Sequence, residues 1–329
     1  MVRPVTDRKT TWSQLATFAE VAETGSVHAA ARRLTVTESA VSASLAALHK
    51  AIGVPLLERE GRGLRLTPAG HAYADYARRI LGLLDEARLV ALDEHSPGTG
   101  TLRLAAVTSA GEQLLPRLVT GFRASRPGLG LELEVGTKAQ VWARILEHRA
   151  DLAIAGRPPA DSDLVTRAIR RHELSVVAAP EVANQIAASG GDVRNQVWLQ
   201  REDGSGTRET TEALLESLQA DPPQLTLGSN GAVLAGAVAG LGVALISADA
   251  ARQQVQSGDL VVVPVPGTPL DRPYHLVTRA GVSRLVHDFL RYVLADRPGE
   301  GDRFQAVPGR RASPALPPGA GSRRGSAPT

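Results

Sequence analysis

Between Trp12 and Gly53 the sequence predicts three short helices that follow one another with very tight connections. Apolar residues recur at every third or fourth position, and Gly25, which readily accepts a positive φ, ends the first helix. A turn at 35–37 separates the second helix from the third, for which Thr37 is a good N-cap. Two helices joined by a three-residue turn form a helix-turn-helix, whose second helix enters the major groove of DNA. This part of the chain therefore predicts a DNA-binding domain.

A hairpin and a long helix are expected next. Residues 54–66 predict a small β-hairpin whose glycine-containing tip carries Arg62. Thr67 can then cap a helix, Pro68 suits its first turn, and apolar residues keep helical spacing to about Glu94. Such a rod would be roughly 40 Å long. Its apolar stripe is too long for the small domain beside it to cover, so a second copy of the helix is the natural cover.

Beyond a hinge at 96–100, predicted strands alternate with predicted helices. This alternation is typical of an α/β fold, in which helices cover the sheets. Strands are expected at 101–107, 131–135, 151–155, 174–178, 197–200, 225–227, 243–246 and 260–264.

The composition excludes several classes of protein. At 329 residues the chain is too long for one ordinary core. It has no cysteine, which excludes disulfides, thiolate metal sites and cysteine nucleophiles and fits a reducing cytoplasm. No apolar stretch approaches the ~20 residues of a membrane span, and no signal peptide is recognisable. We therefore expect a cytoplasmic protein without membrane contacts.

Positive charge is concentrated at the C-terminal end. The net charge is +3, and residues 297–329 contribute six arginines against two acidic residues, or +4, which leaves −1 for the rest. The prediction of DNA binding therefore depends on the local motif and not on bulk charge. Residues 297–329 are rich in Pro, Gly and Ser with few large apolar residues, so we expect a disordered, dispensable basic tail.

Five successive motifs carry a family resemblance. They are Thr17–Val27, Ala29–Leu34, Thr37–Ser42, Ile52–Arg59 and Leu66–Gly70. In order and spacing they closely resemble the LysR family of bacterial transcription regulators. The resemblance implies four parts: a winged helix-turn-helix at 1–70, a dimerising linker helix at 71–95, an effector-binding domain at 98–296 similar to type 2 periplasmic binding proteins, and the tail at 297–329.

The resemblance also implies an architecture and partners. Lobe one of the sensor would comprise 98–171 and 265–296, and lobe two 172–264, with a small molecule bound between them. Homodimers would assemble into homotetramers on double-stranded promoter DNA with an interrupted inverted repeat. The implied function is regulation of transcription, without a cofactor, a metal or catalytic residues.

A second motif points to the kind of effector. Residues 201–208 read Arg-Glu-Asp-Gly-Ser-Gly-Thr-Arg and join a predicted strand to a predicted helix. Backbone N–H groups, hydroxyls and a guanidinium at a helix start favour an anion. The stretch resembles LysR-type regulators of carbon-fixation and sulfur-assimilation genes, whose sensors take small anionic metabolites; Asp203 departs from the Glu usual there. The alternative is a purely structural loop.

Residues expected at the DNA lie on the second and third helices and the hairpin tip. By resemblance they are Arg32, Thr37, Glu38, Ser39, Ser42, Ala43 and Arg62. Glu38 stands where many relatives have Gln, and its carboxylate can accept from cytosine N4. Stabilisation of the first helical turn is an equal alternative for Glu38. Arg62 is a candidate for phosphate or minor-groove contact.

Residues expected at the effector lie at four strand-to-helix turns rich in small hydroxyl residues. They are Thr108, Ser109, Thr137, Lys138, Ser205, Gly206, Thr207, Arg208, Ser229 and Asn230. Ser109 and Thr137 are the best candidates for donors to the anion, and either could equally be a plain helix cap. A solute-binding receptor or a small-anion enzyme with an added helical domain would fit the sensor half alone. The N-terminal block argues against both, and His172-Glu173 lacks the second His of a zinc helix.

Overall fold

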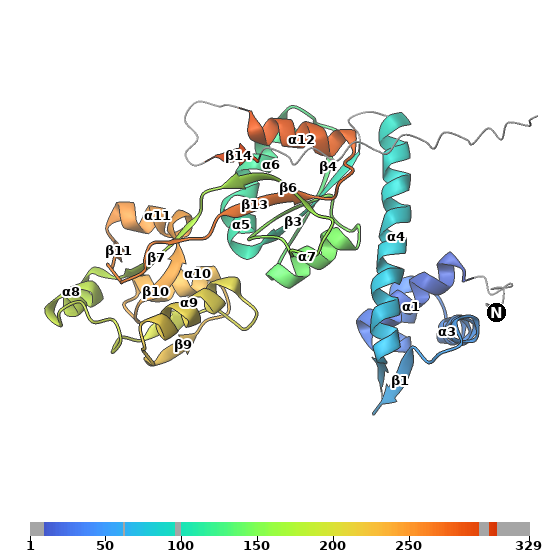
Figure 1. Cartoon of the computed structure of the whole chain (residues 1–329), viewed down its shortest axis with the longest axis horizontal. Coiled ribbons are helices and arrows are strands. Elements are labelled where there is room, and N and C mark those ends of the chain that lie inside the picture. The colour runs from blue at the N-terminus through green and yellow to red at the C-terminus, as the bar shows by residue number, and fades with distance from the viewer. Residues whose placement is uncertain (1–9, 62, 96–99, 296–302, 308–329) are drawn as a thin grey trace, which may run out of the picture.

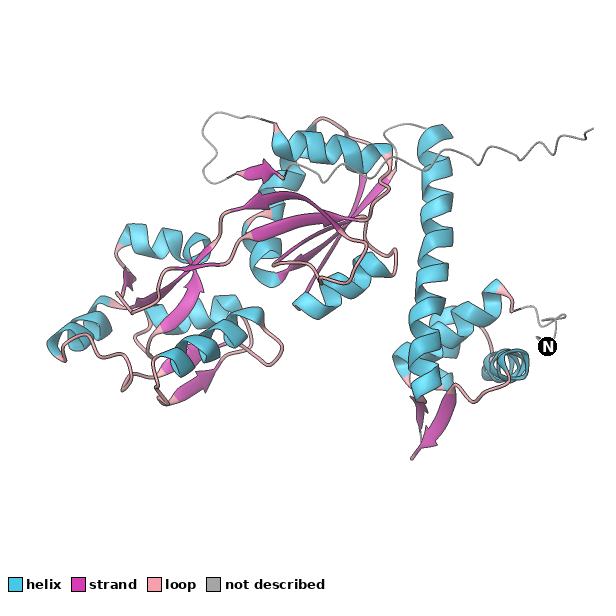
Figure 2. Ribbon diagram, viewed as in Figure 1, coloured by secondary structure: helices cyan, strands magenta, loops and turns pink. Residues whose placement is uncertain are grey.

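A computed structural model describes residues 10–61, 63–95, 100–295 and 303–307 (Figure 1). Figure 2 shows a small helical domain, one long helix beside it and a two-lobed α/β region. The small domain consists of α1 (Trp12–Thr24), α2 (Val27–Leu34), α3 (Glu38–Ile52), β1 (Leu57–Glu60) and β2 (Gly63–Leu66). The long helix is α4 (Pro68–His95). Among the described residues no helix is long and apolar enough to cross a membrane.

Local signals explain why the small domain has these boundaries. Thr11 and Gln14 form a capping box at the start of α1, and Gly25 ends α1 with a φ of 63°. Gly53 ends α3 in the same way, with a φ of 83°. Phe18 is fully buried in the core that α1, α2 and α3 share with the first turns of α4. The helix-turn-helix therefore has a compact support for its exposed face.

Lobe one is a six-stranded sheet with helices on both faces, in the order β14-β6-β13-β5-β3-β4. Strands β3, β4 and β5 are parallel, and β6, β13 and β14 run antiparallel to their neighbours. The strands are β3 (Thr101–Val107), β4 (Gly130–Gly136), β5 (Leu152–Ala155), β6 (Val165–Arg170), β13 (Tyr274–Thr278) and β14 (Phe304–Ala306). The helices are α5 (Thr108–Gln113), α6 (Leu115–Ala124), α7 (Lys138–Leu146) and α12 (Arg284–Leu294).

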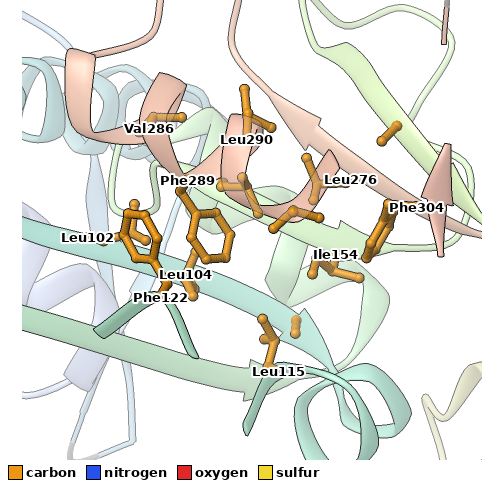
Figure 3. Close-up of a cluster of buried hydrophobic side chains, with 14 of the residues drawn as sticks. Leu102, Leu104, Leu115, Phe122, Ile154, Leu276, Val286, Phe289, Leu290 and Phe304 are labelled. Carbon is orange, nitrogen blue, oxygen red and sulfur yellow. The ribbon is translucent and has the colours of Figure 1, made fainter. Parts of the chain in front are cut away.

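Two apolar layers cover the two faces of this sheet. Phe122 of α6 and Phe289 of α12 pack edge to face, with ring centroids 5.0 Å apart, over Leu102 and Leu104 of β3 (Figure 3). On the other face α7 contributes Trp142 to a separate cluster. Successive residues of β3 alternate between the two clusters, as expected for a strand buried on both faces.

Lobe two has a short sheet of β10, β7 and β11 with β12 also on β7, and a separate parallel pair of β8 and β9. Its strands are β7 (Glu173–Ala178), β8 (Trp198–Gln200), β9 (Gln224–Thr226), β10 (Ala244–Ser247), β11 (Val261–Val262) and β12 (Leu270–Asp271). Its helices are α8 (Pro180–Ala188), α9 (Gly206–Ser217), α10 (Asn230–Val238) and α11 (Ala248–Ser257). Trp198 is fully buried at the centre of this lobe.

The chain crosses between the lobes twice. It leaves lobe one between β6 and β7 and returns between β12 and β13. The expected return at residue 264 is too early, because Leu270 and Asp271 still pair with Leu174 and Glu173 of lobe two. Strands β6 and β13 of the lobe-one sheet, which pair with one another, were also not predicted.

The expectation of a wholly disordered tail from residue 297 is wrong for one short segment. Phe304–Ala306 forms β14, which pairs antiparallel with residues 168–170 of β6. Phe304 is buried in the main core of lobe one (Figure 3), and this burial offsets the entropic cost of ordering the segment. Residues 296–302 and 308–329 lie outside the described residues.

Candidate DNA-binding and effector sites

The start of α3 is capped and exposed. The Thr37 hydroxyl accepts a hydrogen bond from the Ala40 backbone N–H at 3.2 Å and lies 2.9 Å from the Ser39 hydroxyl. Ser42 and Ala43 lie one turn further along and are exposed. Valine and leucine residues on the opposite face of α3 are buried, so these polar and small residues form the face that is free for DNA.

The charged residues near this face differ in whether their side chains form ion pairs within the domain. The Glu38 carboxylate lies 2.8 Å from Nδ1 of the His28 ring, and both side chains are largely exposed. Arg32 is exposed, whereas the neighbouring Arg33 is paired with Glu20 at 2.7 Å. Arg62 lies outside the described residues.

Seven of the predicted effector residues line one cleft between the lobes. They are Thr108 and Ser109 at α5, Thr137 and Lys138 at α7, and Ser205, Gly206 and Thr207 at α9. The cavity volume is about 90 Å³; one water needs roughly 10 to 15 Å³, so a ligand of several non-hydrogen atoms fits. Three helix starts face this space, and each brings backbone N–H groups and a positive dipole end.

Two arginines that were not predicted also line the cleft. Arg201 is buried, with 4 % of its surface exposed, and donates to Glu202 at 2.6 and 2.7 Å and to Asn230. Arg272 lies on the crossing from β12 to β13 and donates to the Thr210 hydroxyl. Arg201 begins the motif at 201–208 and could have been selected from it. Arg272 has no local signal, because only the second crossing brings it to the cleft.

Three predicted effector residues do not line the cleft. Arg208 turns to its own helix and loop, where it pairs with Glu212 at 2.8 Å and Asp203 at 2.7 Å. Ser229 caps α10 by accepting from the Ala232 backbone N–H. Asn230 is buried and donates from Nδ2 to Glu112 of lobe one at 3.1 Å. Asn230 therefore joins the lobes at the edge of the cleft.

An aromatic pair forms the back of the cleft. The rings of His172 and Tyr274 stack with centroids 4.0 Å apart. Burial lowers the pKa of His172 to about 4, so its ring is neutral near pH 7. Burial also raises the pKa of Tyr274, against a hydrogen bond with Ser109 that lowers it. The positive charge of the cleft therefore comes from its arginines and Lys138.

A helix-turn-helix joined by a long helix to a two-lobed cleft defines a ligand-responsive DNA-binding regulator. Residues 12–71 match the family model "Bacterial regulatory helix-turn-helix protein, lysR family", and residues 95–297 match "LysR substrate binding domain". The chain belongs to the LysR family of transcription regulators. It is a DNA-binding regulator with a small-molecule effector domain and not an enzyme.

The resemblance to carbon-fixation regulators is confirmed by similar proteins. The chain is 32 % identical over 293 residues to the HTH-type transcriptional activator CmpR of Synechocystis sp., which covers 88 % of this chain and 96 % of CmpR. It is 31 % identical over 298 residues to the RuBisCO operon transcriptional regulator of Acidithiobacillus ferrooxidans, covering 88 % and 94 % of the two chains.

Two solved structures are similar over most of their own length. Full-length CbnR complexed with its target DNA has a TM-score of 0.59 at 25 % identity, covering 86 % of this chain and 98 % of CbnR. The regulatory domain of CcmR from Synechocystis, solved in complex with 2-PG, has a TM-score of 0.52 at 28 % identity, covering 58 % and 94 %.

Proposed function

We propose that this regulator responds to a small anionic metabolite held in the cleft between its lobes. The observation that carries the proposal is the convergence of three helix starts, two arginines and five serine and threonine hydroxyls on one small space. Glu202 is the one carboxylate among the lining residues, and it is already paired with Arg201. The net field favours an anion, as does the similarity to the CcmR regulatory domain solved with 2-PG.

Specific residues have separate roles in this proposal. Arg272 and Lys138 supply charge from the two sides of the cleft, while Ser109, Thr137 and Thr207 donate hydrogen bonds to the anion's oxygens. Arg201 is held by Glu202 and Asn230, so it contributes a fixed donor and not a mobile one.

On DNA, α3 is proposed to lie in the major groove, with Ser39, Ser42 and Ala43 toward the base edges and Arg32 toward the phosphates. Glu38 is proposed either to read a cytosine or to stabilise the start of α3 while paired with His28. Two such domains of a dimer would contact successive major grooves roughly 34 Å apart, at an interrupted inverted repeat. Dimers would pair into tetramers, as the family resemblance implies.

An anion that binds the closed cleft better than the open one shifts the lobes toward closure. Both crossings between the lobes enter lobe one, and lobe one contacts α4. Closure of the cleft would therefore act through α4 on the placement of the DNA-binding domains. The effect on DNA affinity can be no larger than the difference in effector affinity between the two states.

The experiment is a DNase footprint on DNA upstream of the protein's own gene, titrated with small phosphorylated and sulfur-containing anions. We expect one anion to shorten or shift a long protected region. Arg272→Gln should raise the half-maximal anion concentration by about tenfold or more, because a charge-assisted hydrogen bond is lost.

Arg208→Gln is the matched control, since Arg208 belongs to the same motif but lies outside the cleft lining. It should leave the anion response nearly unchanged. A larger effect of Arg208→Gln than of Arg272→Gln would contradict the proposed site. A footprint that no anion changes would refute the anionic effector, while the conclusion that the protein binds DNA would stand.

A further inference from the structure

A second and larger cavity lies between the lobes at the other end of α5. Its volume is about 580 Å³, against about 90 Å³ for the effector cleft. Thr108 and Ser109, at the start of α5, line the effector cleft, whereas Gln113, at its end, and Leu114 line the second cavity. Helix α5 contacts α11 of lobe two, and the two cavities share no lining residue. The second cavity is therefore a separate compartment and not an extension of the effector cleft.

The charge of this cavity is strongly positive. Four arginines and one carboxylate line it, which gives a net charge of +3 among the lining residues. Arg117 of lobe one and Arg252 of lobe two are exposed and approach the space from opposite lobes. Asp249 is occupied, because it pairs with the buried Arg170 at 2.8 Å and with Arg252. An anionic ligand would balance part of this net charge of +3.

The remaining walls are apolar or amide-bearing. Leu114, Leu118, Leu234, Val293 and Phe304 supply the apolar surface. Four glutamines also line the space, and the Oε1 atom of Gln254 is buried without a hydrogen-bond partner among the described residues. A buried acceptor without a partner costs free energy, so a ligand that donates an O–H or N–H there would bind favourably.

We propose that the second cavity binds a phosphate ester with a body of nucleoside size. Arginines from both lobes would hold the phosphate, the apolar walls would cover the ring, and Gln254 would accept from a hydroxyl or amine. Most of the 580 Å³ would be left empty by an inorganic anion alone. The site includes β14, so the short ordered segment of the tail gains a role as one wall of a ligand site.

Isothermal titration of the full-length protein tests this, with AMP, inorganic pyrophosphate and adenosine as probes. We expect AMP to bind most tightly, pyrophosphate more weakly and adenosine not measurably. The double variant Arg117→Gln/Arg252→Gln should weaken AMP binding by about tenfold or more. No AMP binding to the wild-type protein, or equal binding to the double variant, would overturn the proposal.

Arg123→Gln is the matched control, because Arg123 is exposed on the same helix as Arg117 but does not line the cavity. It should leave AMP binding unchanged, and equal thermal melting of all variants shows that each is folded. Arg272→Gln should also leave AMP binding unchanged, which separates this site from the effector cleft. A loss of AMP binding in Arg272→Gln would place AMP in the effector cleft and refute the second site.

A chain ending at Val307 keeps β14 and removes the rest of the tail. It should bind AMP as the full chain does, because Arg303 and Phe304 remain in the wall. Loss of binding in this shortened chain would assign AMP to the basic tail and contradict the proposed cavity.

Discussion

At the scale of single residues, the burial of His172 sets the charge at the back of the effector cleft. Burial is the main cause that lowers its pKa to about 4; Asp249 opposes the shift, and Arg170 and Arg272 reinforce it. A protonated ring there would add a third fixed cation behind Arg201 and Arg272. The neutral ring instead stacks on Tyr274, so the positive charge offered to the proposed anion comes from the arginines and Lys138.

The same shift predicts how stability depends on pH. The unfolded chain protonates His172 near pH 6.5, whereas the folded protein does so only near pH 4. Between these values the unfolded state binds more protons, so the free energy of unfolding falls as the pH drops. We expect this residue to account for a loss of about 2 kcal/mol between pH 7 and pH 5.

Denaturant unfolding of the wild-type protein and His172→Gln at both pH values measures this loss. The variant should lose less stability than the wild-type protein on acidification, since glutamine does not titrate. Equal losses in the two proteins would show that His172 is not buried as a neutral ring.

At the scale of elements, α4 crosses lobe one at a glycine. A Cβ atom on Gly82 would lie 1.8 Å from the backbone oxygen of Glu147, so only glycine allows this approach. Ion pairs surround the crossing: Arg78 with Glu147 at 2.6 Å, and Glu86 with Arg279 at 2.8 Å and with His148. These ion pairs hold α4 against lobe one around the close approach at Gly82.

Gly82→Ala tests this close approach, because the direction of the change in melting temperature shows whether α4 crosses lobe one at this residue. In a free helix this change stabilises by about 1 kcal/mol, because alanine has the higher helix propensity. Here we expect a lower melting temperature, because the added methyl group must displace the Glu147 backbone. A raised melting temperature would contradict the crossing of α4 on lobe one.

At the scale of the whole molecule, α4 exposes apolar residues that a single chain does not cover. Tyr76, Ile80, Leu83 and Val90 are 65, 44, 54 and 40 % exposed. Together with Ala87 they repeat at alternating spacings of four and three residues, the pattern of a coiled-coil contact. We therefore predict that two copies of the chain pair along this stripe.

Ile80→Glu/Leu83→Glu should separate the copies, because two charges would be buried at the contact. We expect sedimentation to show about half the wild-type dimer mass and DNA affinity to fall by about 100-fold or more, since two half-sites are no longer bound together. Arg88→Gln, on the same helix but off the stripe, should change neither. A double variant of unchanged mass would exclude this interface.

The N-terminal domain could be derived from sequence because its determinants are local. Gly25, Thr37 and Gly53 each end or cap a helix within one short stretch, and the structure places those boundaries as expected. The turns that carry Thr137 and Ser205 were likewise visible as strand-to-helix connections, and both line the cleft.

The tertiary structure alone decided which residues those turns bring together. Arg272 reaches the cleft only because β12 remains in lobe two before the chain returns, and Arg208 leaves it because Glu212 and Asp203 compete for its guanidinium. Phe304 is ordered only because β6, far away in the sequence, offers a strand edge and a core. Caps and periodicity depend on neighbouring residues, whereas ion-pair choice and strand pairing depend on contacts that exist only after the chain has folded.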